Sequence, residues 1–419
     1  MNFQYDESTY EGDVRGAYKT GCFEIALNCE FNMNLELMKT ADLGTFLHEY
    51  VHFLQNISTL WGIHAGIVRN NDLCEMVHSM EPLEEIHLPY KFEPSQEQKL
   101  RRSWLQCSIG TGHSRVKIDR TKAGRFYYRE IDGFPIAMHE VIFSVKDENG
   151  ADVDIVIGAT IIKESMAVMY QSLIDPDCVS EHPDVPYNAI QIWCEKHFPN
   201  VAGDTKKLIC LCYISLFNLD PGFSLMLLLR EANLHPEKSG IEFFDEYKEE
   251  YATSDGKKVK IVDFFNHLIE QYKISLRGVL PCDLDYTSLL LDRVKLENGI
   301  VPILNVLNTD SFGIENVNSL ISYLGLPFMH QADGKQFYTL VDGRQHSFQD
   351  VVVIAGNAAM YDYFMDPYRN YGSCPFRILC DRDEPECWDT PWKQKECIFE
   401  VGVGSLNLER KRFVKDYIQ

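Results

Sequence analysis

Residues 41–68, ADLGTFLHEYVHFLQNISTLWGIHAGIV, decide how this chain is interpreted. Their apolar residues recur every three or four positions, which predicts one long amphipathic helix. Thr40 and Asp42 are the two candidates for its N-cap, since a short polar side chain there can bond the first free N–H groups. The apolar face is formed by Leu43, Phe46, Leu47, Val51, Leu54 and Ile57.

Within this segment, residues 48–52 read His-Glu-Tyr-Val-His, the pattern HExxH. An α-helix turns once in about 3.6 residues, so His48 and His52 lie one above the other and can bind one Zn²⁺. Glu49 points about 100° away, from where it can act as general base on a water at the ion. The alternative is a surface helix whose histidines face water. The apolar neighbours argue against it, because buried imidazoles need partners.

A catalytic zinc site needs a third protein ligand and an open position for water. Glu164 is the best candidate. It belongs to residues 159–174, ATIIKESMAVMYQSLI, which again have helical spacing and an apolar face. The alternative is an ordinary surface carboxylate that pairs with Lys163 or with solvent.

Other third ligands stay open. His52 is followed by FLQNIST, which has no third His at the close spacing of metzincins. His64 is on the same predicted helix, where it would lie about 18 Å along the axis from His52 if the helix is unbroken. Glu140 and Glu195 are the remaining fallback ligands.

The HExxH motif, with Gly158-Ala159 and the later stretch Glu164-Ser165-Met166-Ala167, resembles the gluzincin arrangement of zinc peptidases. This resemblance implies a zincin-like core in which His48, His52 and Glu164 hold the metal and Glu49 is the base. It also implies that an edge strand near the motif helix binds substrate as an added strand.

Hydrolysis also requires a donor for the oxyanion that forms at the attacked carbonyl. Tyr127, Tyr128, His139 and Tyr170 are eligible by residue type, and the sequence does not rank them. The alternative for each of them is a purely structural role.

The rest of the chain predicts an α+β protein that is mainly helical, with a small sheet and a C-terminal α/β portion. Residues 20–33 suggest a strand, and residues 115–157 suggest several strands with hairpin turns at Asp132-Gly133 and Asn149-Gly150. Residues 81–103 suggest a loop followed by a short helix. Further helices are predicted at 187–198, 205–217, 222–233 and 260–275.

The C-terminal region is mixed. Residues 285–325 look mostly helical, and residues 336–355 predict a hairpin that turns at Asp342-Gly343. We place a boundary near 280, which separates a metallopeptidase domain, residues 1–280, from a mixed region, residues 281–419. Four cysteines near the end, Cys374, Cys380, Cys387 and Cys397, suggest reduced thiols in a loop-rich tail, with a structural second zinc as the alternative.

Charge and composition exclude some partners. The 419 residues include 40 Lys and Arg and 62 Asp and Glu, which gives a formal net charge of −22. An acidic chain has no general attraction to nucleic acid or anionic membranes, and the basic residues between 99 and 125 are interpreted as a solvated surface. No secretory signal or apolar span is evident, so we expect a soluble, cytoplasmic protein.

These observations predict a zinc-dependent endopeptidase that hydrolyses a peptide bond in a protein substrate through a metal-activated water. Its expected partners are a protein or peptide substrate and a regulatory protein, by analogy with proteases of bacterial toxin or antiviral defence systems. Three alternatives remain: a zinc hydrolase of a non-peptide amide, a zincin-fold binding module, and a helical interaction protein in which the motif is accidental. An intact Glu49 argues against the binding module, because a scaffold needs no general base.

Overall fold

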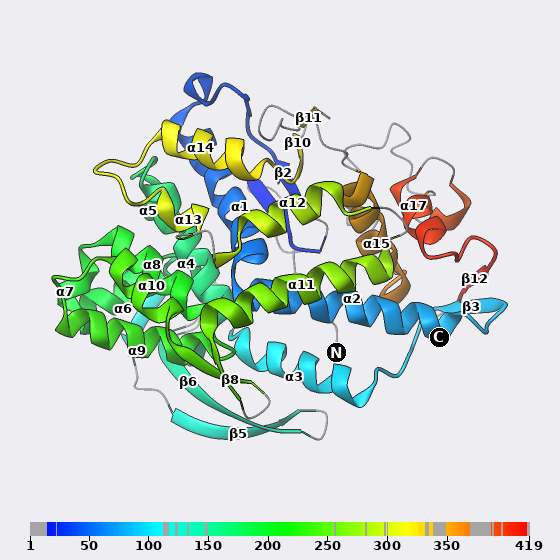
Figure 1. Cartoon of the computed structure of the whole chain (residues 1–419), viewed down its shortest axis with the longest axis horizontal. Coiled ribbons are helices and arrows are strands. Elements are labelled where there is room, and N and C mark those ends of the chain that lie inside the picture. Colours follow the sequence, from blue (N-terminus) through cyan, green and yellow to red (C-terminus); the bar gives the residue numbers. More distant parts are fainter. Residues whose placement is uncertain are drawn as a thin grey trace.

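A computed structural model of the chain is shown in Figure 1. Helices make up most of it and the strands form small sheets, which confirms the α+β, mainly helical class. For residues 117–121, 125–131, 134–140, 145–146, 252–254, 257 and 337 the backbone alone is described. The structure describes residues 15–21, 23–111, 117–121, 125–131, 134–146, 150–254, 257–280, 283–296, 299, 301–331, 335–337, 349–368, 387, 389–394 and 397–416.

The predicted helix over 41–68 is two helices, α1 (Thr40–Ser58) and α2 (Leu60–Met80). They meet at Thr59, whose backbone is extended, with φ −112° and ψ 153°. The Thr59 side chain accepts a hydrogen bond from the N–H of Gly62, and so caps α2. The prediction of one helix was wrong because the apolar pattern continues through Thr59, where the backbone is extended and a new helix begins.

The expected cap residues of α1 were also wrong. The N-cap is Lys39, which makes no side-chain capping bond. Thr40 and Asp42 lie inside the helix, and Asp42 is buried and forms an ion pair with Arg15. The first turn of α1 is therefore tied to the residue that precedes the first strand.

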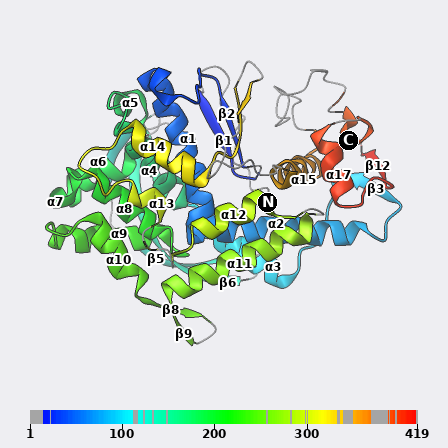
Figure 2. The same ribbon diagram turned by 45° about the horizontal axis from the view of Figure 1, so that its top comes forward.

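A four-stranded sheet packs beside α1, in the order β1-β2-β10-β11. Strand β2 pairs antiparallel with β1 and parallel with β10. The strand predicted within 20–33 is confirmed in β2, and Figures 1 and 2 place this sheet between α1 and α15 (Gln349–Met365). Its strands are β1 (Gly16–Lys19), β2 (Glu24–Leu27), β10 (Phe328–Gln331) and β11 (Gln336–Phe337).

The region 115–157 forms a second, antiparallel sheet, as its alternating sequence predicts. Strand β6 is central, with β4, β5 and β7 paired to it. Asp132, Gly133 and Asn149 of the predicted turns lie outside the described residues. The four strands are β4 (Lys117–Thr121), β5 (Arg125–Ile131), β6 (Phe134–Lys146) and β7 (Asp152–Ile157).

Directly after β7, α4 (Ala159–Ser172) returns through the core and packs along α1. The helices predicted between 187 and 275 are confirmed, with ends shifted by a few residues. The helices after α4 are α5 (Cys178–Glu181), α6 (Ala189–His197), α7 (Pro199–Ala202), α8 (Thr205–Ser215), α9 (Pro221–Leu234), α10 (Gly240–Lys248) and α11 (Ile261–Val279). A short hairpin of β8 (Tyr251–Ser254) and β9 (Lys257–Lys260) precedes α11.

The C-terminal region adds α12 (Asp285–Arg293), α13 (Pro302–Asn305), α14 (Ile314–Leu324), α15 and α17 (Ile398–Ser405). The hairpin predicted over 336–355 was wrong at its end, because helix α15 begins at Gln349. Asp342 and Gly343 lie outside the described residues. A strand was missed in 81–103, where β3 (Glu85–Leu88) pairs with β12 (Arg412–Lys415) near the end of the chain.

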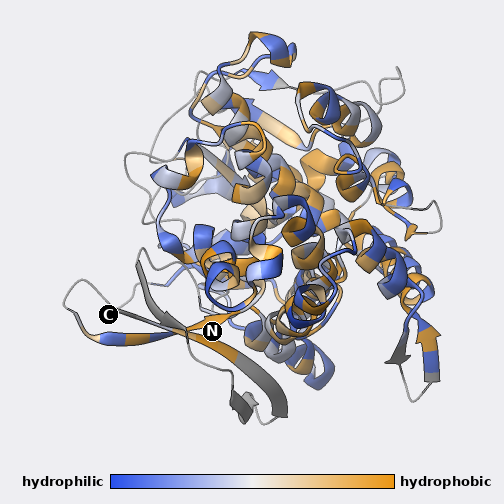
Figure 3. Ribbon diagram, turned by 90° about the vertical axis from the view of Figure 1, so that its left-hand side faces the viewer, coloured by the Kyte–Doolittle hydropathy of each residue, from blue (hydrophilic) through white to orange (hydrophobic). Residues whose placement is uncertain are grey.

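One hydrophobic core runs through the described residues on both sides of position 280. In Figure 3, hydrophobic stretches run through the elements in the middle of the view, and hydrophilic residues mark many of the outer turns. The boundary near 280 stays a prediction, although the core crosses it. In the part of the chain that the structure describes, no helix is both long and apolar enough to cross a membrane.

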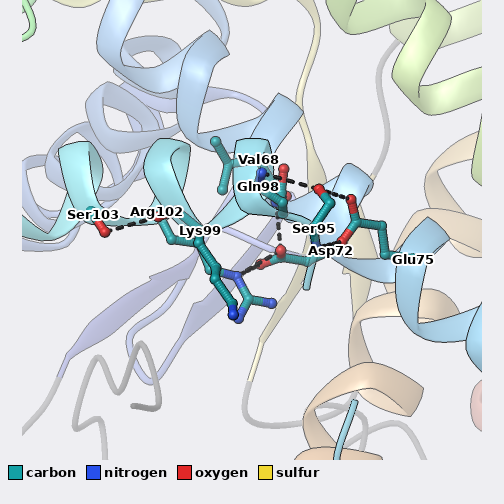
Figure 4. A network of polar contacts seen from close by, with 8 residues as sticks. All are labelled: Val68, Asp72, Glu75, Ser95, Gln98, Lys99, Arg102 and Ser103. Atoms are coloured by element: carbon teal, nitrogen blue, oxygen red, sulfur yellow. Dashed lines mark hydrogen bonds and ion pairs between the residues drawn. The ribbon is translucent and has the colours of Figure 1, made fainter. Parts of the chain in front are cut away.

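Helix α3 (Gln96–Ser108) is held against α2 by polar contacts, drawn in Figure 4. The Arg102 Nε donates to both carboxylate oxygens of Asp72, at 2.7 and 2.8 Å. Glu75 accepts from the backbone N–H and the hydroxyl of Ser95, at 2.8 and 2.6 Å. Part of the predicted basic surface is therefore engaged in an inter-helix contact.

Candidate metal centre

Helix α1 presents its motif to the interior. His48, Glu49 and His52 are 7%, 8% and 8% exposed. The alternative of a surface helix with water-facing histidines is therefore excluded. The motif position between them, Tyr50, is also buried and donates its hydroxyl to the carbonyl of Gly325 at 2.7 Å. The motif helix is thus anchored to the chain that leads into β10.

Helix α4 brings Glu164 to the two histidines. The Nε2 of His52 lies 3.2 Å from the Nε2 of His48 and 3.2 Å from Oε2 of Glu164. The Nε2 of His48 lies 3.4 Å from the same oxygen. Among the described residues, this is the group of His, Cys, Asp or Glu side chains whose ligand atoms converge closely enough to hold one metal ion.

The spacing of these three atoms fits a tetrahedral ion. Ligand atoms at about 2.0–2.1 Å from a Zn²⁺, with tetrahedral angles, stand about 3.3 Å from one another. The observed separations are 3.2, 3.2 and 3.4 Å. Two nitrogen donors and one carboxylate oxygen are also a donor set found in catalytic zinc sites, where a fourth position stays open.

The protonation of His52 supports the same interpretation. The carbonyl of Lys163 can only accept, so the Gln55 side-chain NH₂, at 3.0 Å, donates to it. Gln55 Oε1 then faces Nδ1 of His52 at 3.0 Å and accepts a hydrogen bond from its N–H group. In a neutral imidazole this leaves Nε2 with a bare lone pair that faces the carboxylate of Glu164. Two lone pairs at this distance need a cation between them, either a metal ion or a proton.

Burial and the neighbouring imidazoles shift the pKa of Glu164 in opposite directions. Burial acts to raise the pKa of its carboxyl, but the adjacent imidazoles of His52 and His48 outweigh burial and hold the pKa well below its usual value. Its neighbour Lys163 is 4% exposed, and burial lowers the pKa of the ammonium to about 8, although Glu164 acts to raise it. The candidate ligand Glu164 and the Lys163 ammonium are therefore buried at consecutive positions of α4.

Glu49 lies where β1 crosses α1. A Cβ added to Gly16 would stand 2.9 Å from Cγ of Glu49 and 3.2 Å from its Oε1. Real side chains do not tolerate the first of these distances, so the close approach of strand and carboxylate requires glycine at this position. The edge strand of the sheet and the candidate base are thus direct neighbours.

Two residues of the site were missed by the sequence reasoning. The rings of His182 and Tyr187 both lie 6.1 Å from the ring of His48, between centroids, and 4.6 Å from each other. Burial, and then the charge of His48, lower the pKa of His182 to about 4, so it is neutral at pH 7. No motif marks either residue, because they reach the site through the segment after α5, where His182 is the C-cap of that helix and Tyr187 lies in a π-helical turn, Asp184–Asn188.

Polar contacts hold the segment 182–188 in place. Asn188 donates its side-chain amide to the carbonyls of Val179 and His182, at 3.0 and 3.2 Å. Ser165, next to Glu164 on α4, donates to the carbonyl of Pro186 at 2.8 Å. The wall formed by His182 and Tyr187 is therefore positioned by the same helix that supplies the carboxylate.

The fallback ligands do not join the cluster. Glu195 is exposed, and the side chain of Glu140 lies outside the described residues. His64 is half-buried on α2, beyond the break in the predicted helix, and burial together with Arg101 lowers its pKa to about 4. The ligand atoms that converge come from His48, His52 and Glu164.

The oxyanion candidates and the cysteines are mostly outside the described side chains. Tyr170 is buried and donates its hydroxyl to the carbonyl of Ile303, which is a structural contact. The side chains of Tyr127, Tyr128 and His139 are not among those described. Cys374 and Cys380 are likewise outside the described residues, whereas Cys387 and Cys397 are partly buried, so the second zinc site stays a prediction.

Comparisons of the chain with protein-family models, with curated proteins and with solved structures found no match. The relation to gluzincins therefore stays the expectation that the two motif helices raised.

Proposed function

We propose that this chain is a zinc-dependent peptidase with a zincin-like core formed by α1, α4 and the sheet that begins with β1. The observation that carries the proposal is the convergence of His48, His52 and Glu164 at distances suited to a tetrahedral ion. A structural site would close its coordination sphere with a fourth protein ligand. Among the described residues three ligand atoms converge, which favours a site with an open position.

A bound Zn²⁺ would supply Lewis-acid chemistry, which polarises a substrate carbonyl and makes water a better nucleophile at neutral pH. Glu49 would take one proton from the attacking water as the new C–O bond forms. It would return that proton to the leaving nitrogen as the C–N bond breaks, so that a carboxylic acid and an amine result. The remaining proton of the acid then passes to the amine, and the products leave as carboxylate and ammonium. The base is regenerated unchanged in each cycle.

His182 and Tyr187 are better placed than Tyr170 to donate a hydrogen bond to the developing oxyanion. Both rings stand beside His48, and Tyr170 is engaged elsewhere. A neutral imidazole or a phenol can donate to an anionic oxygen without bringing a second positive charge to the ion. Either residue therefore suits a site that already contains a divalent cation.

The edge strand supports a peptide rather than a small amide as substrate. Among the described residues, strand β1 ends its sheet in the order β1-β2-β10-β11, and a Cβ at its Gly16 would stand 2.9 Å from Cγ of Glu49. An extended peptide paired with such an edge would bring its carbonyls past the general base. A non-peptide amide remains the second candidate, because the metal ligands and the base would serve it equally well.

Metal analysis and a cleavage assay test the proposal together. Purified protein should contain one zinc per chain, or two if the C-terminal cysteines bind a second ion. Proteome-wide comparison of digests should find peptide bonds cut by the wild type and not by Glu49→Gln. A proton in place of the metal would leave the protein zinc-free with His52 and Glu164 as an ion pair, which would overturn the proposal. Zinc without any Glu49-dependent peptide cleavage, but with turnover of small amides, would favour the second candidate.

A further inference from the structure

The two histidines of the cluster differ in the hydrogen bonding of their Nδ1 atoms. The Nδ1 of His52 bonds to Gln55, whereas the buried Nδ1 of His48 has no hydrogen-bond partner in the described part of the chain. Gln55 is fully buried, at 0% exposed, one helical turn beyond His52. A buried glutamine must satisfy both ends of its amide, and here each end meets a different helix.

We propose that Gln55 is a positioning residue that orients the His52 imidazole and at the same time holds α4, with Glu164, at its distance from α1. The amide reaches His52 at 3.0 Å on one side and the carbonyl of Lys163 at 3.0 Å on the other. Lys163 is the residue directly before Glu164. One side chain thus connects His52 directly to the residue that precedes Glu164.

The link has a reciprocal counterpart. The Lys163 ammonium returns to α1, where it donates to Oδ1 of Asn56 at 2.9 Å. It also lies over the indole ring of Trp61, 5.3 Å from the centroid. Two consecutive residues of α1, Gln55 and Asn56, are therefore bonded to the backbone and the side chain of a single residue of α4. This arrangement resists both sliding and rotation of one helix against the other.

The consequence for the metal follows from the lone pair of His52. While Gln55 accepts from Nδ1, the proton stays on that nitrogen and Nε2 is free to bind a cation. Without this acceptor, the imidazole can place its proton on Nε2 and bond to Glu164 instead, which removes two ligand atoms at once. Outer partners of this kind typically change metal affinity about 10- to 100-fold.

The inference rests on the ligand set of the proposed function but on no hydrolytic activity, so the test measures zinc affinity. Gln55→Met keeps the approximate size and removes both bonds, and we expect its zinc Kd, measured by chelator competition, to rise about 10- to 100-fold. Gln55→Glu retains an acceptor for Nδ1 of His52 but has no donor for the carbonyl of Lys163, so its Kd should rise less than that of Gln55→Met. If Gln55→Met does not fold, Gln55→Asn replaces it in the test. The shorter Asn side chain cannot reach both His52 and the carbonyl of Lys163.

Gln98→Met is the matched control. Gln98 is also a buried glutamine, 2% exposed, with a bond to a helix carbonyl, that of Val68 at 2.7 Å, but it lies in the α2–α3 contact. This variant should lose stability and keep the wild-type zinc Kd. A wild-type Kd in Gln55→Met, or equal losses in Gln55→Met and Gln55→Glu, would overturn the role of Gln55. Failure of the wild type itself to bind zinc would instead overturn the proposed function.

Discussion

Two buried carboxylates of the site, Glu49 and Glu164, have different surroundings. Glu164 faces two imidazole nitrogens at 3.2 and 3.4 Å, which suits a ligand that stays ionised. Glu49 follows His48 on α1 and meets the edge strand at Gly16 instead. The two residues are therefore expected to fail in different ways when they are substituted, and this difference can be measured.

Glu49→Gln should retain the metal and the fold but lose hydrolysis. The amide is nearly the same size as the carboxyl, but it cannot accept a proton from water, and general-base catalysis contributes about 10²–10⁴-fold. The measurement is kcat on a cleaved substrate, with zinc content determined on the same sample. Turnover close to that of the wild type would show that another group is the base.

Glu164→Ala should lose the ion, because two histidines alone do not complete a catalytic zinc site. The double variant His48→Ala with His52→Ala should lose it as well. Zinc stoichiometry by elemental analysis is the measurement, and Glu195→Ala, an exposed carboxylate on α6, is the control that should keep one ion. Full zinc content in Glu164→Ala would remove this residue from the ligand set.

His64 is expected to make the fold sensitive to acid. Burial lowers its pKa from 6.5 to about 4, so between these values the unfolded chain binds a proton that the folded chain does not. Stability should therefore fall as pH drops through this window, by at most about 3 kcal/mol from this residue. Denaturant unfolding of chelator-treated wild type and His64→Gln at several pH values measures it. Parallel pH curves for the two proteins would contradict the assignment.

At the scale of elements, the α2–α3 contact offers a stability test that is separate from the site. Asp72 is 4% exposed and is bonded by Arg102 through Nε. Removal of one partner of a buried ion pair leaves the other charge without compensation, which costs about 3–5 kcal/mol. The candidate site lies between α1 and α4, so the binding of a metal there should be unaffected.

Arg102→Met should therefore lower the free energy of unfolding by about 3 kcal/mol while zinc content stays unchanged. Arg101→Met is the control, since Arg101 forms an exposed pair with Glu97 one turn away and such pairs contribute at most about 0.5 kcal/mol. Urea unfolding of the three proteins provides the comparison. Equal stability of both variants would mean that the Arg102–Asp72 pair contributes no more than a surface contact.

At the scale of the whole molecule, the region after residue 280 pairs back onto strands of the N-terminal region. Strand β10 pairs with β2, and the hydroxyl of Tyr50 bonds to Gly325. Strand β12 similarly pairs with β3. The segment after 280 thus contributes to the sheet and the helix that position the candidate site.

A chain that ends at residue 280 is therefore expected to lose cooperative folding, because β2 would lose its parallel partner and the hydrophobic core would lose the residues that follow position 280. Thermal unfolding monitored by circular dichroism, with the full chain as control, tests this. A sharp transition together with one bound zinc in the truncated chain would establish residues 1–280 as an independent domain.

The sequence by itself determined the parts of this protein that depend on short-range periodicity. Helical spacing placed His48 and His52 on one face, and alternation predicted the sheet over 115–157, because both patterns follow from backbone geometry within a few residues. The residue chemistry of Glu164 also made it the favoured third ligand. The break at Thr59 was missed, since a capped corner leaves the apolar pattern intact.

Tertiary structure alone decided which distant residues share the site. The approach of Glu164 to His52 spans 112 residues and depends on how α4 packs on α1. The ring wall of His182 and Tyr187, the bonds of Gln55 to two helices, and the pairing of β10 with β2 have no local signal either. Such contacts depend on the packing of the whole core, in which each side chain must fit neighbours that are distant in the sequence.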